Sequence, residues 1–424
     1  MAEKVRYYLE QSVPELEDLK KKGLFDKSEI MMIMRRRTDF EQRIQGRGSK
    51  PRDFMKYSDF EMNLEKLRKK RYNRYTKAGL IDTKPTISDW AGTRRIMFIF
   101  DRATRRYPGE LEIWSKYLKF AKSNGAIKVI YKVYSRLLQL QPRNIDAWLS
   151  AAKYEFETNA NAKGSRILFQ RGLRLNPESL KLWLEYVSFE LSYVTKLLVR
   201  RKVLGLITEK QQQDELDTNE KQLQEKLFQI DNNDEDFKQD LIELPKTDDI
   251  NEQLNNLPEA DMNMLGNPET NPALKGDVAL TIFDLCIPTI AKTIPKESTN
   301  KDDKIIDVCQ QFLTLFDKFD QLDQNYLYSH VLNYLQVNYP RDPKTMFVDI
   351  TLPIRNVNMD DPSFAENLQL TVNKFMAYKL KLTDSLQINQ MTDLFITELN
   401  EKYLNKSNDE KLSNLLKAII KKCS

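Results

Sequence analysis

Aromatic residues recur at three-residue intervals in four separate segments of the chain. Three segments contain Phe54, Tyr57 and Phe60; Trp114, Tyr117 and Phe120; and Trp183, Tyr186 and Phe189, and the fourth contains Trp148 and Tyr154 with Ala151 at the middle position. A three-residue interval places side chains along one face of an α-helix. The pattern therefore predicts a helix in each segment, with its aromatic face packed against neighbouring helices.

These helices belong to a longer repeat. Trp114, Trp148 and Trp183 are 34 and 35 residues apart, and a second helical segment that ends at a proline lies between successive aromatic segments. In "FIFDRATRRYP", "YKVYSRLLQLQP" and "RILFQRGLRLNP", an aromatic residue lies eight positions, and an arginine six positions, before the proline. A repeated helix pair is typical of an α-solenoid, in which each pair buries its apolar face against its neighbours.

The pattern divides the chain into four parts. Residues 1–48 have helical apolar spacing and are expected to form a helical N-terminal cap, and residues 49–207 carry the clear repeats. Residues 208–274 lose the repeat register and are expected to be an acidic, low-order insertion. Residues 275–424 resume the helical pattern as degenerate repeats of the same kind. The predicted fold is therefore an all-α solenoid of helix pairs.

Charge is distributed unevenly along this architecture. Residues 1–110 contain 27 Lys and Arg against 17 Asp and Glu, whereas residues 209–269 contain 5 against 18. Such asymmetry concerns partners and electrostatic steering rather than the fold. A basic N-terminal region and an acidic inner segment both point to binding functions.

Residue types needed for catalysis are sparse. The chain has one histidine, His330, and three cysteines, Cys286, Cys309 and Cys423, without a Cys-x-x-Cys spacing. No phosphate-binding glycine motif and no metal-ligand cluster is recognisable. We therefore expect a protein that is not an enzyme and that uses no metal or cofactor. Without an apolar N-terminal segment or a long apolar run, it is expected to be soluble and intracellular.

The Trp-x2-Tyr-x2-Phe-Glu helix followed by an arginine-bearing helix resembles the HAT (half-a-TPR) repeat. The N-terminal segments "YYLEQSVPELEDLKKKGLF", "EIMMIMRRRTDFEQRI" and "KPRDFMKYSDFEMNLEKLRKKR" resemble the start of the U3 small nucleolar RNA-associated protein 6 family. This resemblance covers the N-terminal third closely and the remainder through its architecture.

The resemblance implies a subunit of the small-subunit processome, the nucleolar ribonucleoprotein assembly in which U3 snoRNA acts on pre-rRNA. The implied function is that of a non-catalytic scaffold needed for maturation of 18S rRNA and assembly of the 40S subunit. The implied partners are WD-repeat β-propeller subunits of a UtpB-type subcomplex and their extended tails, with U3 snoRNA or pre-rRNA contacted indirectly or through phosphates. The implied location is the nucleolus within the nucleus.

The repeat residues are interpreted as structural. The predicted repeat core comprises Phe54, Tyr57, Phe60, Trp114, Tyr117, Phe120, Trp148, Tyr154, Trp183, Tyr186 and Phe189. Burial of large apolar side chains against a neighbouring helix is favoured over base stacking for these residues. Glutamates that follow the aromatic segments (Glu61, Glu155 and Glu190) are expected to pair with second-helix arginines (Arg102, Arg136 and Arg171).

A basic strip lies within residues 35–77. Its candidate contacts for phosphates or an acidic partner are Arg35, Arg36, Arg37, Arg68, Lys69, Lys70, Arg71 and Arg74. A solvated helix face, a protein contact and an RNA-backbone contact all remain open for these cations. No signature of an RNA-recognition or KH domain is present, which disfavours sequence-specific base readout.

Two other functions remain open at this point. One is a HAT scaffold in another RNA-processing machine, such as splicing or 3′-end cleavage. The other is a protein that binds the RNA backbone directly through the basic strip, with an affinity that falls steeply with salt.

Overall fold

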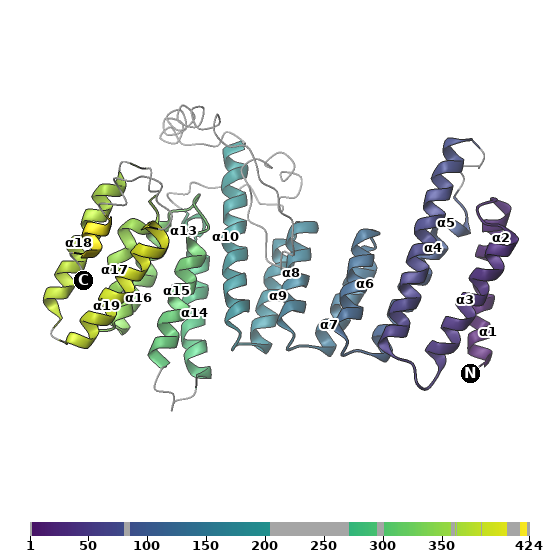
Figure 1. The fold of residues 1–424 in the computed structure, drawn as a ribbon, viewed down its shortest axis with the longest axis horizontal. Helices are drawn as coiled ribbons and strands as arrows, with labels where there is room; N and C mark the ends of the chain where they lie inside the picture. The colour runs from purple at the N-terminus through teal and green to yellow at the C-terminus, as the bar shows by residue number, and fades with distance from the viewer. Residues whose placement is uncertain are drawn as a thin grey trace. The chain divides into compact units, whose positions relative to one another are not determined.

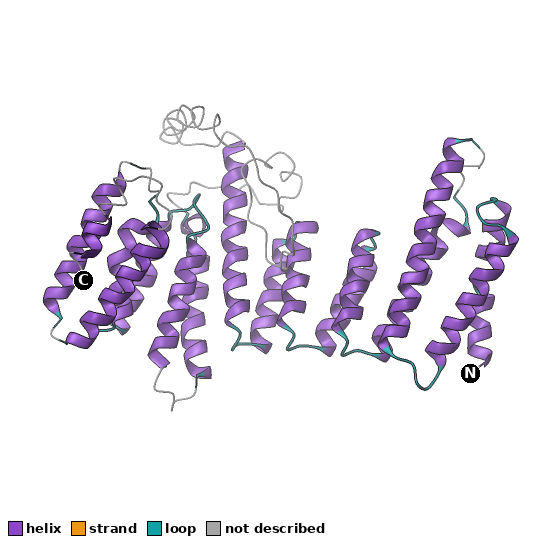
Figure 2. Ribbon diagram, in the orientation of Figure 1, coloured by secondary structure: helices purple, strands orange, loops and turns teal. Residues whose placement is uncertain are grey.

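The computed structural model describes residues 2–79, 85–203, 271–294, 301–357, 361, 363–382, 384–404 and 416–421. Within these residues all regular structure is helical, which confirms the predicted all-α class (Figure 1, Figure 2). The chain forms two compact units, Met1–Ala147 and Trp148–Ser424. Each is described separately.

The first unit is a series of helices joined by short connections. They are α1 (Ala2–Glu10), α2 (Val13–Lys21), α3 (Lys27–Gln45), α4 (Pro51–Lys77), α5 (Ile87–Arg106), α6 (Leu111–Ser123) and α7 (Ile127–Leu140), followed by the start of α8 (Ile145–Lys153). Helices next to each other in sequence pack together from α3 to α7, as expected for a repeat array.

Three helices of this unit begin with the same local device. An acidic side chain in the first turn accepts a hydrogen bond from the backbone N–H that precedes the helix: Glu29 from Asp26 (3.0 Å), and Asp53 from Lys50 (2.8 Å). Asp89 does the same at the start of α5. Each bond satisfies a backbone donor that the helix itself leaves free. The sequence therefore fixes where α3, α4 and α5 begin.

The second unit also consists of packed helices. After α8 come η1 (Tyr154–Thr158), α9 (Ala162–Leu175), α10 (Leu180–Val203), α13 (Pro272–Lys275), α14 (Asp277–Thr293), α15 (Lys301–Phe316), α16 (Gln324–Asn338), α17 (Pro343–Arg355), α18 (Ser363–Lys381), α19 (Ser385–Glu398) and η5 (Leu399–Leu404). The helix α10 packs against α14 and α15, so helix packing continues between the parts before and after residues 204–270.

The predicted acidic insertion lies largely outside the described residues. Its last part, 271–274, contributes the start of the short helix α13, whose Leu274 is buried. The proposed boundaries 1–48, 49–207, 208–274 and 275–424 stay predictions.

The aromatic repeat recurs in three dimensions. A second-helix phenylalanine stacks on the tyrosine of the next aromatic segment in three places: Phe40 on Tyr57, Phe100 on Tyr117 and Phe169 on Tyr186, with ring centroids 5.1, 5.4 and 5.2 Å apart. The same phenylalanines lie at a tilt against Phe60, Phe120 and Phe189. These contacts repeat because each copy has the same residues at the same helical spacing.

Two of the repeat tryptophans, Trp114 and Trp183, occupy equivalent positions. The indole N–H of Trp114 donates to the carbonyl of Pro108, and that of Trp183 to the carbonyl of Pro177, each at 3.0 Å. The proline that ends one helix thus also provides the acceptor that positions the next aromatic segment. This bond satisfies the one polar atom of a largely buried indole.

The predicted core residues lie inside or at the edge of the two units. Those that are buried are Phe54, Tyr57, Trp114, Tyr117, Trp148, Tyr154, Trp183, Tyr186 and Phe189, whereas Phe60 and Phe120 are half-buried. Their burial supports the packing role over base stacking, which needs exposed ring faces.

Candidate functional site

The basic strip of α3 and α4 does not present all of its cations to solvent. Among the eight candidate contact residues, Arg35, Arg36, Lys69, Lys70 and Arg74 are exposed, Arg71 is half-buried, and Arg37 and Arg68 are buried. The strip therefore divides into an exposed set and an internal set.

Arg37 belongs to the interior of the first unit, and its assignment as a contact residue is corrected. Its guanidinium donates to both carboxylate oxygens of Glu61, at 2.7 and 2.9 Å, and lies 3.6 Å from Glu15. Burial disfavours the charged guanidinium, but the carboxylates of Glu61 and Glu15 outweigh burial and raise the pKa of Arg37. At 1% exposure, the side chain cannot reach a phosphate or a partner.

Arg68 is corrected for the same reason. It donates to both oxygens of Glu65, at 2.8 and 2.7 Å, and to Asp89 of α5 at 3.1 Å. Burial lowers the pKa of Arg68, but hydrogen bonds and charges of Glu65 and Asp89 outweigh it and raise that pKa overall. The side chain joins α4 to α5 instead of facing solvent.

Arg71 is also held internally, although it is partly accessible. It donates to both carboxylate oxygens of Glu29, at 2.7 and 2.8 Å, and to the carbonyl of Leu24. The hydrogen bond from Arg71 lowers the pKa of Glu29 to about 2. The guanidinium also lies over the Phe25 ring, with its carbon 4.7 Å from the ring centroid. Arg71 therefore joins α4 to the start of α3.

Further ion pairs, between half-buried arginines and buried glutamates, extend this network within the first unit. Arg95 of α5 donates to Glu15 of α2, and Arg102 of α5 donates to both oxygens of Glu41 of α3, at 3.0 and 2.9 Å. Together with Arg37, these side chains link α2, α3, α4 and α5 through charge-assisted hydrogen bonds. The helices that precede the first clear repeat are thus joined to it by ion pairs as well as by apolar packing.

Two of the three glutamates pair with an arginine, but neither pairs with one of the expected arginines. Glu61 pairs with Arg37, and Glu190 pairs with Arg166 through both oxygens, at 2.8 and 2.7 Å. Each partner lies three residues before the stacking phenylalanine, in "RTDF" and "RILF", and therefore shares its helix face. The arginine that pairs with the glutamate is therefore marked by its position three residues before the phenylalanine, and not by its position six residues before the proline.

The arginines that were expected to pair have other surroundings. Arg102 contacts Glu41, and Arg136 lies 3.7 Å from Asp101. Arg171 is exposed and forms no ion pair within the part of the chain that the structure describes. The Glu155 carboxylate accepts hydrogen bonds from the side-chain amides of Asn159 and Asn161, at 3.4 and 3.3 Å.

The histidine and two of the cysteines form no recognisable reactive site. His330 is half-buried, and its Nε2 lies 2.9 Å from Asp284. Cys286 and Cys309 are buried, and burial raises the pKa of the Cys309 thiol to about 12. Cys423 lies outside the described residues. The described residues contain no cluster of His, Cys, Asp and Glu that could hold a metal ion, and no described helix has the length and apolarity of a membrane span.

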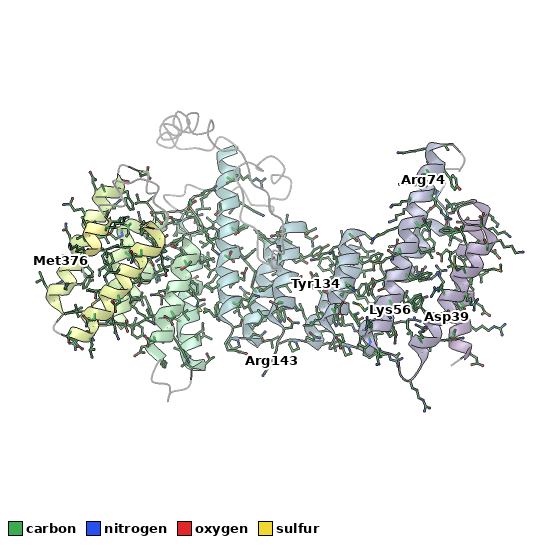
Figure 3. All side chains as sticks on the ribbon, in the orientation of Figure 1. Asp39, Lys56, Arg74, Tyr134, Arg143 and Met376 are labelled. Atoms are coloured by element: carbon green, nitrogen blue, oxygen red, sulfur yellow. The ribbon has the colours of Figure 1, made fainter. Side chains whose placement is uncertain are left out.

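Two hollows flank α3. One, of about 540 Å³, lies between α1 and α3 and includes Val5, Leu9 and Met34 in its lining. The other, of about 410 Å³, lies between α3 and α4 and is lined mainly by apolar side chains, with Arg36 and Glu29 among them. Figure 3 shows Asp39 on α3 and Lys56 and Arg74 toward opposite ends of α4, the two helices that form the second hollow.

Two family models match parts of the chain that include α3 and α4 or the helices that follow them. Residues 9–95 match the family model of U3 small nucleolar RNA-associated protein 6, and residues 86–213 match that of the PRP39 N-terminal HAT repeat. Residues 86–213 thus resemble HAT repeats, and the N-terminal part of the chain resembles the U3 small nucleolar RNA-associated protein 6 family. The first match includes α3 and α4, and hence the hollow between them.

Individual relatives agree with the family models. The chain is 44% identical to U3 small nucleolar RNA-associated protein 6 of Schizosaccharomyces pombe over 204 residues, which are 48% of this chain and 41% of that protein. It is 34% identical to the Homo sapiens homologue over 197 residues, which are 46% of this chain and 32% of that protein. The chain therefore matches less than half the length of these relatives.

A more distant similarity concerns a pre-mRNA-processing factor. Pre-mRNA-processing factor 39 of Schizosaccharomyces pombe is 28% identical over 95 residues, which are 22% of this chain and 16% of that protein. This match is shorter and weaker than those to the U3-associated proteins.

Proposed function

We propose that this HAT-repeat chain is a scaffold subunit of the nucleolar small-subunit processome, where it supports pre-rRNA processing to 18S rRNA and 40S assembly without catalysing a reaction. The observation that carries the proposal is the match of residues 9–95 to the U3 small nucleolar RNA-associated protein 6 model. The described helices also fit a scaffold, because stacked helix pairs offer an extended surface to partners.

The proposed partners are WD-repeat β-propeller subunits of a UtpB-type subcomplex and their extended tails. U3 snoRNA and pre-rRNA are proposed as indirect partners, or as partners contacted only through phosphates. Burial of Arg37 and Arg68 supports the emphasis on protein contacts, because it removes two cations from the surface that RNA could use. The proposed location is the nucleolus.

A scaffold of another RNA-processing machine is the second candidate, and one observation favours it. Residues 86–213 match the PRP39 HAT repeat, and pre-mRNA-processing factor 39 is among the relatives. The N-terminal match to the U3-associated family covers helices that this second match does not contain, and we therefore place the processome first.

Affinity purification of the full chain from growing cells tests the proposal. The sample is divided into RNase-treated and untreated halves, and proteins and RNAs are identified in both. A processome scaffold retains its propeller partners after RNase, and U3 snoRNA appears only in the untreated half. Loss of the proteins with RNase would favour direct RNA binding, and spliceosomal RNAs in place of U3 snoRNA would favour the second candidate.

A further inference from the structure

The groove between α3 and α4 combines an apolar floor with access to solvent. Its apolar lining residues are Phe25, Met32, Ile33, Phe40, Phe60, Leu64 and Leu67. Met32 and Leu67 are 60% and 41% exposed. The volume of about 410 Å³ lies in the range of pockets that hold a ligand or several side chains. Large apolar side chains left open at such a site indicate a binding surface.

Unpaired positive charge surrounds this floor. Lys56 and Arg74 share a side of α4 with Phe60 and Leu67, because residues four and seven apart lie on one helix face. By the same spacing, Arg43 shares a side of α3 with Arg36, which lines the groove. All four cations are exposed and form no ion pair within the described part of the chain.

The acidic side chains near the groove do not cancel this charge. Glu29 lies in the groove lining, but both of its carboxylate oxygens accept hydrogen bonds from Arg71. Two further acids are exposed beside the groove: Asp39, four residues before Arg43 on α3, and Asp59, four residues before the lining residue Asn63 on α4. They are two acids against the four unpaired cations. The rim therefore has a net positive charge that an acidic partner would complement.

The dimensions and chemistry favour a peptide over RNA. Lys56 and Arg74 are separated by 18 residues of α4, which corresponds to roughly 27 Å along the helix. This length suits a helical or extended segment better than a small molecule. RNA phosphates gain nothing from a floor of Met, Ile and Leu, and the Phe40 ring is already stacked on Tyr57 and thus poorly placed to stack on a base.

We propose that the α3–α4 groove binds an acidic segment of a partner protein. Large apolar side chains of that segment enter the groove, and its carboxylates face Arg36, Arg43, Lys56 and Arg74. This is the helix-in-groove type of recognition, in which apolar anchors recur at intervals of three and four residues and charges fix the orientation. The proposal rests on the scaffold function and names one contact through which the scaffold holds a partner.

Peptide selection on the full chain tests the predicted occupant. A displayed library of random peptides of about 18 residues, enough to span the rim as a helix, is selected on the wild-type chain. Peptides that also bind the Leu67→Asp chain, in which the substitution adds a negative charge to the groove, are removed from the selected pool. Enriched peptides are expected to combine two or more large apolar residues with a net negative charge. Absence of such a consensus, or equal binding to both chains, would overturn the proposal.

A matched pair of variants then locates the binding site. Arg35→Glu and Arg36→Glu change the net charge equally and affect adjacent exposed residues, but only Arg36 lines the groove. Fluorescence anisotropy with a labelled enriched peptide should show binding at least about tenfold weaker for Arg36→Glu. For Arg35→Glu the affinity should stay within about twofold of wild type, because Arg35 does not line the groove. Both variants must retain wild-type helicity and melting temperature.

Equal losses in both variants, with displacement of the peptide by single-stranded RNA, would show a diffuse phosphate-binding surface and overturn the groove assignment. The scaffold function is tested separately by the wild-type purification. If the wild-type chain retains propeller proteins and U3 snoRNA while the peptide results are negative, only the groove proposal fails. If the wild-type chain retains neither, the scaffold function fails whatever the peptide results are.

Discussion

Removal of the Arg37 cation should strongly destabilise the first unit. The substitution Arg37→Met keeps an apolar chain of similar length but leaves Glu61, which is 2% exposed, without its cation. Glu15, at 4% exposure, keeps only Arg95. Breaking a buried ion pair by removing one partner costs about 3–5 kcal/mol, because the remaining charge is buried without compensation. We expect a loss of this size.

The double variant Arg37→Met/Glu61→Leu should be more stable than Arg37→Met alone. Replacing both members of a buried pair by apolar residues is often close to neutral, and here only the weaker Glu15 contact at 3.6 Å is additionally lost. The second substitution is therefore expected to recover a large part of the lost stability. Arg35→Met is the control, because Arg35 is exposed and unpaired in the described residues, and should change stability by less than about 0.5 kcal/mol.

Hydrogen exchange measured peptide by peptide is the suitable assay, because it reports the two units separately. A loss of 3–5 kcal/mol corresponds to amide exchange about 140- to 4000-fold faster in α3 and α4. Amides of α16, in the second unit, serve as an internal reference and should be unchanged. Protection of α3 and α4 within tenfold of wild type in Arg37→Met, or a double variant less stable than the single one, would refute the reasoning.

Substitutions at three further positions have expected outcomes. Trp183→Ala should cost about 3–5 kcal/mol and increase exchange in α9 and α10, whereas Trp183→Phe, which mainly loses the indole hydrogen bond, should cost about 1–2 kcal/mol. Arg71 lowers the pKa of Glu29 from 4.5 to about 2, so the stabilisation from this ion pair is complete above pH 4.5 and is lost as the pH falls toward 2. Glu29→Gln should therefore have a lower melting temperature than wild type at neutral pH and the same melting temperature as wild type near pH 2. Gly92→Ala should lower the melting temperature despite a helix-propensity gain of about 1 kcal/mol, because its Cβ would lie 2.5 Å from the fixed carboxylate of Glu65; a higher melting temperature would contradict this packing.

The repeat could be predicted from the sequence because each of its helices is defined by residues that lie close together in the chain. The three-residue aromatic spacing at Trp114 and Trp183, with the preceding proline, defines a helix face and a helix start within one segment. The structure adds the stacking of Phe169 on Tyr186, which depends on the relative phase of two helices. A sequence fixes each phase separately, but how two faces meet depends on tertiary packing.

The environment of charged residues could not be predicted from composition in the same way. In "MRRRTDF", three adjacent arginines look equivalent, yet Arg35 and Arg36 are exposed and Arg37 is buried. The difference is a rotation of about 100° per residue around the helix axis. Arg37 shares the face of Phe40 and therefore meets Glu61. The groove between α3 and α4 was equally hidden from sequence analysis, because it arises from the fit of two helices and not from any one motif.

The burial of some candidate cations limits the electrostatic contribution that the eight candidate residues could make to RNA binding. Eight cations suggested a large electrostatic contribution, but only five are exposed: Arg35, Arg36, Lys69, Lys70 and Arg74. Each phosphate contact contributes about −0.7 to the slope of log affinity against log salt for a single strand, so five contacts give a slope of about −3.5. A steeper slope for the full chain would require cations other than these five. A shallower slope, together with binding that depends on Leu67, would instead indicate that the apolar groove makes the main contact.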